Sequence, residues 1–248
     1  MRVLWPKEHG VYVQVVLPIL TALCVGPTLP GTLIGTSVIS GFLLHEPLLI
    51  LRGGRGRRAL SEVGAEAKLQ ATFLFITGAA TGLSGFILSP LPARIALLTL
   101  FAFSGATLLV ARRFGEKALC TELAVAITFS SAFVPIALIE AGEYGPTFTV
   151  AWIWAAVFGL QTLTIHAVKS RRPLLPHLTS VLSAVFVIGS SAGAQLVTPL
   201  LAGLLPPSLV TAAIMIYRVK PRQLKRIGWS FMCVDTCAWL VFLWLWNP

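Results

Sequence analysis

Long apolar runs separated by short polar connections make up most of this chain. A bilayer core of about 30 Å is crossed by a helix of about 20 apolar residues. We therefore predict nine transmembrane helices, over residues 10–28, 31–51, 67–89, 93–112, 117–140, 147–168, 175–197, 200–217 and 226–246. Because the connections are short, consecutive helices are expected to be antiparallel, and residues 1–248 are expected to form a single integral membrane domain.

The composition excludes a water-soluble protein. Hydrophobic residues make up 56% of the chain and charged residues only 11%, whereas about a quarter of a soluble domain is charged. The same apolar content excludes an intrinsically disordered chain. The fold class that remains is an all-α, polytopic membrane helical bundle.

The basic residues predict the orientation of the bundle. Lys and Arg collect in cytoplasmic loops, and with the N-terminus inside, all 19 basic residues except Arg94 fall on the cytoplasmic side. The prediction is therefore nine helices with the N-terminus in and the C-terminus out. The net charge of +10 is explained by this bias and by contacts with anionic membrane lipids, without nucleic acid as a partner.

The distribution of polar residues predicts two halves of four helices. The second and sixth predicted helices each end with a histidine, His45 and His166, followed by an arginine-rich loop. The first and fifth each begin near an acid, Glu8 and Glu122. We predict halves at about 1–113 and 114–217, related by an axis along the membrane normal, plus a ninth helix within 218–248.

Ionisable residues of the predicted helices gather near the cytoplasmic boundary. Such residues are costly in a bilayer, so they usually face a bundle interior and mark function. On a closed ring of helices they would line a pocket open to the cytoplasm. The candidate catalytic residues are Glu122, His166 and His45, and the candidate ligand-binding residues are His9, Glu46, Arg52, Arg55, Arg57, Arg58, Lys169, Arg171, Arg172 and His177.

The arginines predict an anionic ligand. Guanidinium groups pair with phosphate or carboxylate oxygens, and the glycines of RGGRGRR (52–58) would let backbone N–H groups approach an anion. The alternative is that these arginines only set the topology. Glu46 beside Pro47 is alternatively satisfied within a kinked helix, and Glu122 is alternatively an ion-pair partner of Lys117 or of an arginine.

Metal and cofactor motifs are missing from the sequence. Mixed His and carboxylate ligands suit Zn²⁺, Mn²⁺ or Fe²⁺, but without HxxxH or HExxH spacing such a site would have to be assembled across helices. We therefore assign no metal ligands and no cofactor. Cys24, Cys120, Cys233 and Cys237 are expected to be small buried apolar residues rather than a disulfide or metal set. Asp235, the single aspartate, falls near mid-bilayer, where Ser230, Thr236 or another helix would satisfy it.

Several motifs resemble known families. WPKEHG (5–10), HEP (45–47) followed by RGGRGRR, and CTEL (120–123) together resemble the YwiC-like family of bacterial membrane proteins. That resemblance implies a multi-pass protein of the bacterial cytoplasmic membrane.

More distantly, the four-plus-four-plus-one layout and residues 120–142 look like the UbiA superfamily of intramembrane prenyltransferases. UbiA enzymes hold a prenyl diphosphate through Mg²⁺ on two aspartate-rich motifs. A chain with one Asp lacks both motifs. The matching places hold His45, Glu46 and arginines in one half, and His166, Lys169, Arg171 and Arg172 in the other.

Three functions are compatible with this pattern. The first is binding or transfer of an isoprenoid or other phosphorylated lipid, in a prenyltransferase-like manner. The second is transport of a small anion or metal, although only Asp235 approaches the midplane, where a transport site is expected. The third is a non-catalytic subunit of a membrane complex with protein partners that the sequence does not identify.

Overall fold

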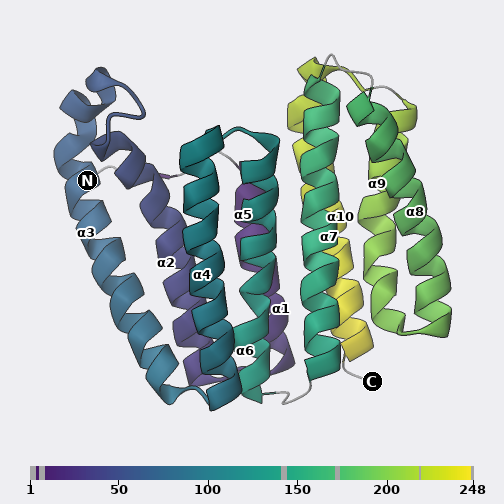
Figure 1. Ribbon diagram of the computed structural model, residues 1–248, viewed down its shortest axis with the longest axis horizontal. Coiled ribbons are helices and arrows are strands. Elements are labelled where there is room, and N and C mark those ends of the chain that lie inside the picture. The colour runs from purple at the N-terminus through teal and green to yellow at the C-terminus, as the bar shows by residue number, and fades with distance from the viewer. Residues whose placement is uncertain (1–3, 6–8, 141–143, 171–173, 218, 247–248) are drawn as a thin grey trace.

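The computed structural model describes residues 4–5, 9–140, 144–170, 174–217 and 219–246. The elements in this part of the chain are all helices (Figure 1). They are α1 (His9–Val25), α2 (Leu29–Leu51), α3 (Arg57–Leu88), α4 (Leu91–Phe114), α5 (Leu119–Ser131), α6 (Phe133–Glu140), α7 (Tyr144–Lys169), α8 (Leu174–Leu196), the 3₁₀ turn η1 (Pro199–Leu204), α9 (Leu205–Ile216), the 3₁₀ turn η2 (Pro221–Gln223) and α10 (Leu224–Trp246).

These helices confirm the predicted membrane bundle. Within the described residues, eight helical segments are long and apolar enough to cross a membrane. Three of them join two elements each, namely α5 with α6, η1 with α9, and η2 with α10. The first predicted helix, α1, is shorter, with 17 residues, which is near the lower limit of about 17 residues for a span.

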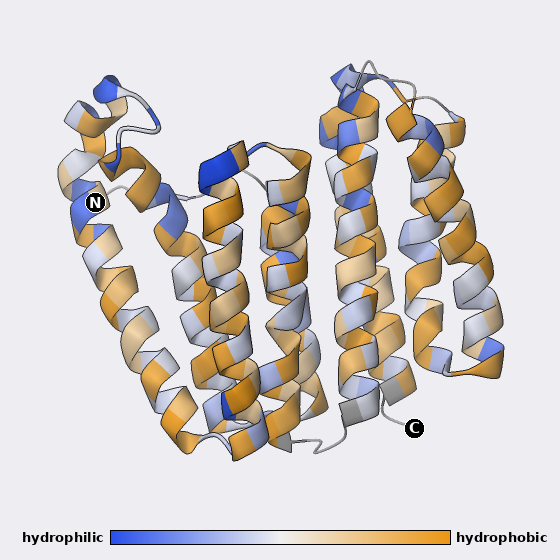
Figure 2. Cartoon of the chain, viewed as in Figure 1, coloured by the Kyte–Doolittle hydropathy of each residue, from blue (hydrophilic) through white to orange (hydrophobic). Residues whose placement is uncertain are grey.

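The connections alternate between the two ends of the bundle. Helices α2, α4, α7 and α9 end where α3, α5, α8 and α10 begin, at one end of the bundle, and the described C-terminus lies at the other (Figure 1). Hydrophilic residues concentrate at the first end (Figure 2), which also carries the arginines of the α2–α3 connection and of the last turn of α4. We call this end the basic face, and it is the end that the positive-inside rule predicts to face the cytoplasm.

Arg94, the only basic residue at the opposite end among those that the structure describes, has a local role. Its Nε donates to the carbonyl of Ser89 at 2.8 Å and its Nη2 donates to the carbonyl of Ile87 at 2.6 Å. These carbonyls belong to the last turn and C-cap of α3, where no intrahelical donors are available. Arg94 therefore closes the end of a helix.

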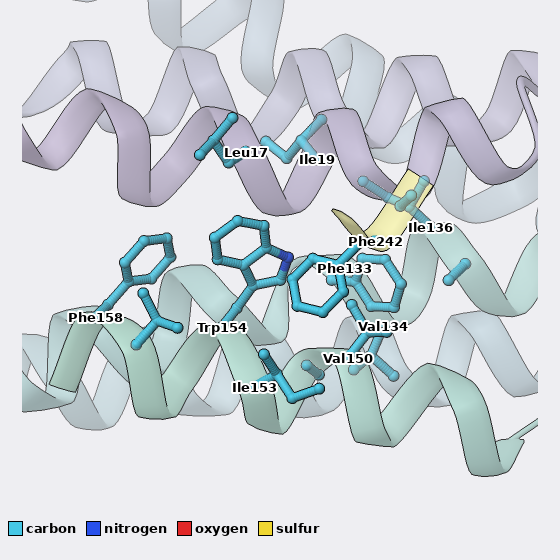
Figure 3. Close-up of a cluster of buried hydrophobic side chains, with 14 of the residues drawn as sticks. Leu17, Ile19, Phe133, Val134, Ile136, Val150, Ile153, Trp154, Phe158 and Phe242 are labelled. Atoms are coloured by element: carbon cyan, nitrogen blue, oxygen red, sulfur yellow. The ribbon is translucent and has the colours of Figure 1, made fainter. Parts of the chain in front are cut away.

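The apolar core lies where α1, α6, α7 and α10 meet. Trp154 of α7 stacks on Phe158 with ring centroids 5.2 Å apart, and its ring meets Phe242 of α10 edge-on at 5.3 Å (Figure 3). Ile19 of α1 and Phe133 of α6 cover the same cluster. By contrast, α3, α4 and α8 are the least buried of the spans, so their apolar side chains face lipid.

The fifth span is interrupted near its middle. Helix α5 ends at Ser131 and α6 begins at Phe133. Pro135 has no N–H to donate to the carbonyl of residue 131, and its ring crowds that turn. The interruption therefore follows from the sequence SSAFVP.

The cysteines differ from the sequence expectation. Cys24, Cys120, Cys233 and Cys237 are free thiols on the outer surface of the bundle, not buried residues. In a membrane the outer surface is itself apolar, so a small apolar thiol gains little from facing the protein interior. The expectation of burial was wrong because it transferred a rule of soluble cores to a chain whose solvent is lipid.

Candidate anion site at the basic face

The two histidines that mark the predicted halves both approach the α4–α5 connection. Nε2 of His45, near the end of α2, lies 4.0 Å from Oε1 of Glu116. Nε2 of His166, near the end of α7, lies 3.1 Å from Oε2 of Glu122 in the first turn of α5. Residues 115–122 therefore form the segment around which the polar groups of this face are arranged.

A third carboxylate is buried and ion-paired. Glu46 of α2 has a side chain that is only 4% exposed. Arg55, from the α2–α3 connection, folds back over it, with Nε 2.9 Å from Oε1 and Nη2 2.5 Å from Oε2. This bidentate geometry is the strongest form of an ion pair between side chains. The Glu46 carboxylate is therefore paired with Arg55 of the loop, and the alternative that a kinked helix alone satisfies it does not hold.

The glycines of the α2–α3 connection shape the turn that brings Arg55 to Glu46. Gly53 and Gly56 have φ angles of 74° and 89°, a region that residues with a Cβ rarely adopt. The N–H groups of Gly53, Gly54 and Gly56 donate to the carbonyls of Ile50, Leu49 and Gly53. The prediction that these N–H groups receive an anion was therefore wrong, because the turn already uses them.

A hollow of about 570 Å³ lies between the α2–α3 connection and the α4–α5 connection. One wall comes from α2 and the loop after it, and the other comes from the α4–α5 connection. Its polar lining includes Arg55, Glu116 and Lys117. The remaining lining is Leu49, Gly54, Phe114, Gly115 and Ala118. The hollow therefore combines two cationic side chains, one carboxylate and an apolar edge.

The N-terminus of α5 lies beside this hollow, which Ala118 lines. Ala118 is the N-cap of α5, and no side chain caps the helix there. The first N–H groups of a helix lack intrahelical partners, and the helix dipole favours an anion beside them. The approach to α5 is held in place, because Oγ1 of the buried Thr121 donates to the carbonyl of Gly115 at 2.8 Å. Lys117 and the uncapped helix end thus flank the same space.

The predicted site residues do not all share one pocket. In the described part of the chain they form separate pairs, Glu46 with Arg55 and Glu122 with His166, while Arg58 pairs with its helix neighbour Glu62. Arg52, Arg57, Lys169 and His177 are exposed at the same face. The side chain of His9, together with Arg171 and Arg172, lies outside the described residues.

Several residues of the site were missed or misassigned by sequence reasoning. Glu116 was not singled out, and Lys117 was considered only as a partner of Glu122, which pairs with His166 instead. Asp235 is bonded by Gln161 of α7, whose Nε2 donates to Oδ1 at 2.5 Å. Ser230 and Thr236, the local partners considered for Asp235, donate to backbone carbonyls of their own helix. The only sequence signal for Glu116 was its place in the basic connection RRFGEK (112–117), four residues before CTEL.

Comparison with known proteins identifies the family of this chain. No curated protein and no solved structure matches it. A family model described as YwiC-like protein matches residues 5–138. That range contains α1 to α5 and most of α6, and with them Glu46, Arg55, Lys117 and Glu122. Because the match covers more than half of the 248 residues, the chain belongs to the YwiC-like protein family and is an integral membrane protein.

Proposed function

We propose that this protein lies in a bacterial cytoplasmic membrane and that its basic face binds the phosphate headgroup of an isoprenoid or other phosphorylated lipid. The observation that carries the proposal is the hollow beside the uncapped start of α5, lined by Arg55 and Lys117. Phosphate oxygens suit a guanidinium, an ammonium and helix N–H groups together.

The position of the hollow favours a lipid over a free anion. It lies where α2 and α4 end, and α4 is the least buried span of the bundle. Phe114 and Leu49 supply an apolar edge. A ligand with its phosphate in the hollow would therefore keep its hydrocarbon chain against α4 and the surrounding lipid. The resemblance to prenyltransferases is the reason for placing isoprenoid phosphates first among such lipids.

The first prediction concerns affinity. Lys117→Ala is expected to weaken binding of farnesyl diphosphate to the detergent-solubilised protein about tenfold, because one phosphate contact of about 1.4 kcal/mol is lost. Isothermal titration calorimetry measures the change. Arg222→Ala removes an exposed charge from η2, also at the basic face but in the α9–α10 connection, and is expected to leave the affinity unchanged.

A panel of ligands separates the sources of the phosphate group. Farnesyl diphosphate and undecaprenyl phosphate are expected to bind more tightly than inorganic pyrophosphate, and farnesol is expected not to bind. If phosphatidic acid binds as tightly as the isoprenoids, the site is a general one for phosphorylated lipids. Equal affinities of the wild type and Lys117→Ala for every ligand would contradict the proposal.

We further propose that Glu122 and His166 act together in proton transfer at this face. They come from different helices and lie 3.1 Å apart, with Glu122 in the first turn of α5, near the hollow. A carboxylate orients a histidine and supports its protonated form, which is the usual arrangement of a general acid or base. His45 is the second candidate, since it lies 4.0 Å from the Glu116 carboxylate that lines the hollow.

The second prediction tests the proton-transfer role of Glu122 and His166. The reaction tested is hydrolysis of farnesyl diphosphate in lipid vesicles, in which water attacks the farnesyl carbon, the Glu122–His166 pair takes the water proton, and farnesol and pyrophosphate are released. Glu122→Gln is expected to slow this hydrolysis by at least about 100-fold and to leave the binding affinity for farnesyl diphosphate within about twofold. His45→Gln is the matched variant. A larger loss with His45→Gln would move the proton-transfer role to His45. Binding without any pyrophosphate release in the wild type would reduce the function to lipid recognition.

A further inference from the structure

A polar layer crosses the otherwise apolar packing of α7, α9 and α10. On the basic side, Ile214 of α9 packs with Ile227 and Phe231 of α10 and with part of α7. On the other side, Trp154 of α7 and Phe242 of α10 belong to the main apolar cluster with η1. Between these two clusters lie Gln161 of α7, Asp235 of α10, and Ser208 and Thr211 of α9.

The members of this layer are deeply buried. Asp235 is 2% exposed, Gln161 4%, Ser208 1% and Thr211 0%. Gln161 donates one hydrogen bond to Asp235. A carboxyl group at this depth in a membrane protein is costly and usually belongs to a functional site. One hydrogen bond from an amide does not satisfy the acceptor capacity of a carboxylate.

The two hydroxyls of α9 behave unlike other buried hydroxyls of the bundle. Thr21, Thr128, Ser130 and Thr164 each donate to the carbonyl four residues earlier in their own helix. Ser208 Oγ and Thr211 Oγ1 are buried without a hydrogen-bond partner in the described part of the chain. A buried polar atom without a partner calls for a ligand, an ion or a water.

Two contacts set the depth of these hydroxyls. A Cβ built on Gly203 would lie 2.3 Å from Cε1 of Phe242, so η1 touches α10 at that level. Nearer the basic face, Ile214 packs in the cluster that contains Phe231. Since the two segments run antiparallel with about 1.5 Å per helical residue, Thr211 falls at the depth of Asp235, and Ser208 falls at the depth of the small residue Ala238.

We propose that this layer is a binding site for a monovalent cation, either a proton or Na⁺, near the middle of the membrane. It offers the Asp235 carboxylate, the Gln161 amide oxygen and two hydroxyl oxygens, a set of hard oxygen donors that suits Na⁺ and also lets Asp235 carry a proton. One carboxylate balances one positive charge. The buried indole N–H of Trp239, one turn from Asp235, also lacks a partner in the described chain and is a donor suited to the carboxylate.

The surroundings isolate Asp235 as the responsive group. Apart from Asp235 and the lysines and arginines at the basic ends, the described titratable side chains of α7, α9, α10 and the helices packed against them come from α1, α5, α7, α8 and α10. They are Tyr12, Cys24, Cys120, Glu122, His166, His177, Cys233 and Cys237. The side chains of Tyr12, Glu122, His166 and His177 are near the basic face, and the four thiols are exposed on the outer surface. Helix α9 carries no titratable residue in Leu205–Ile216.

The experiment is a thermal unfolding series on the purified full chain in detergent. The wild type is compared in NaCl, KCl and N-methylglucamine chloride at equal ionic strength, each over a range of pH. Asp235→Asn keeps an oxygen that accepts from Gln161 but removes the charge, so it retains the helix contact. Thr211→Val removes one hydroxyl at constant shape. Ser230→Ala is the matched control, because that exposed hydroxyl bonds to the carbonyl of Arg226.

Each outcome decides the proposal. A sodium site is identified if Na⁺ specifically stabilises the wild type and Ser230→Ala alike, and this stabilisation is lost in Asp235→Asn. In Thr211→Val the apparent affinity for Na⁺ is then expected to fall about fivefold. A pH response that is the same in all three salts and is lost in Asp235→Asn identifies a proton site. If Asp235→Asn responds to salt and pH as the wild type does, the proposal is overturned. The lipid-binding tests at Lys117 are unaffected by any of these results.

Discussion

Arg55→Ala is expected to lower the free energy of unfolding by about 2–3 kcal/mol, because it leaves the carboxylate of Glu46 buried without its partner. Removing one member of a buried ion pair costs about 3–5 kcal/mol. We take a lower range because the Arg55 side chain is 31% exposed, while that of Glu46 is 4% exposed. The measurement is unfolding in mixed micelles by titration with a denaturing detergent.

Arg58→Ala is the matched control for this prediction. Arg58 also contacts a glutamate, with its Nε 2.6 Å from Oε1 of Glu62, but the two side chains are 90% and 57% exposed. Exposed pairs one helical turn apart contribute about 0.3–0.5 kcal/mol. A second variant, Glu46→Gln combined with Arg55→Gln, removes both charges and is expected to recover part of the loss. Equal effects of Arg55→Ala and Arg58→Ala would show that burial of Glu46 is not what makes the pair important.

Gly203→Val is expected to lower the free energy of unfolding by about 3 kcal/mol or more, at the upper end of the effect of overpacking a core. A Cβ at this position would lie 2.3 and 2.4 Å from two atoms of the Phe242 ring. Phe242 is fully buried and packs edge-on against Trp154, so its ring has no free space into which it can move. The same detergent titration measures the loss.

Two other glycines make the comparison specific. A Cβ at Gly193 would lie 2.5 Å from Cδ1 of Leu201, the end of a flexible side chain, and a Cβ at Gly228 would have no atom within 4 Å. We expect Gly193→Ala to cost less than Gly203→Ala. Gly228→Ala in α10 should be neutral or stabilising by up to about 1 kcal/mol, because alanine favours a helix. Equal losses at positions 203 and 228 would contradict the argument from close packing.

Hydropathy predicted the membrane crossings better than the helices that make them. The third span was predicted over residues 67–89, whereas α3 runs from Arg57 to Leu88. The additional turns carry ALSEVGAEAK, rich in residues that favour helices. Hydropathy detects only the part of a helix that lies in lipid, so the extension of α3 beyond the bilayer gave no signal. The interruption of the fifth span before Pro135 likewise leaves the hydropathy unchanged.

The candidate site was predicted by residue type but not by pairing. The histidines at the ends of α2 and α7 and the acid of CTEL were recognisable because ionisable residues stand out in an apolar chain. Whether Glu122 pairs with Lys117, an arginine or a histidine depends on which helices are neighbours. The polar layer around Asp235 depends on neighbours too, since Gln161 is 74 residues away in the chain.

By itself, the sequence determined that this protein is a helical membrane bundle with a basic face, because the bilayer imposes the same requirement on every segment separately. Each crossing must be apolar and must satisfy its own backbone hydrogen bonds, and both properties are local. The tertiary structure alone decided that Arg55 covers Glu46, that His166 meets Glu122, and that Lys117 shares a hollow with the start of α5. Those contacts depend on distances between helices, and the side-chain interactions that set such distances are too short in range to be read from the order of residues along one chain.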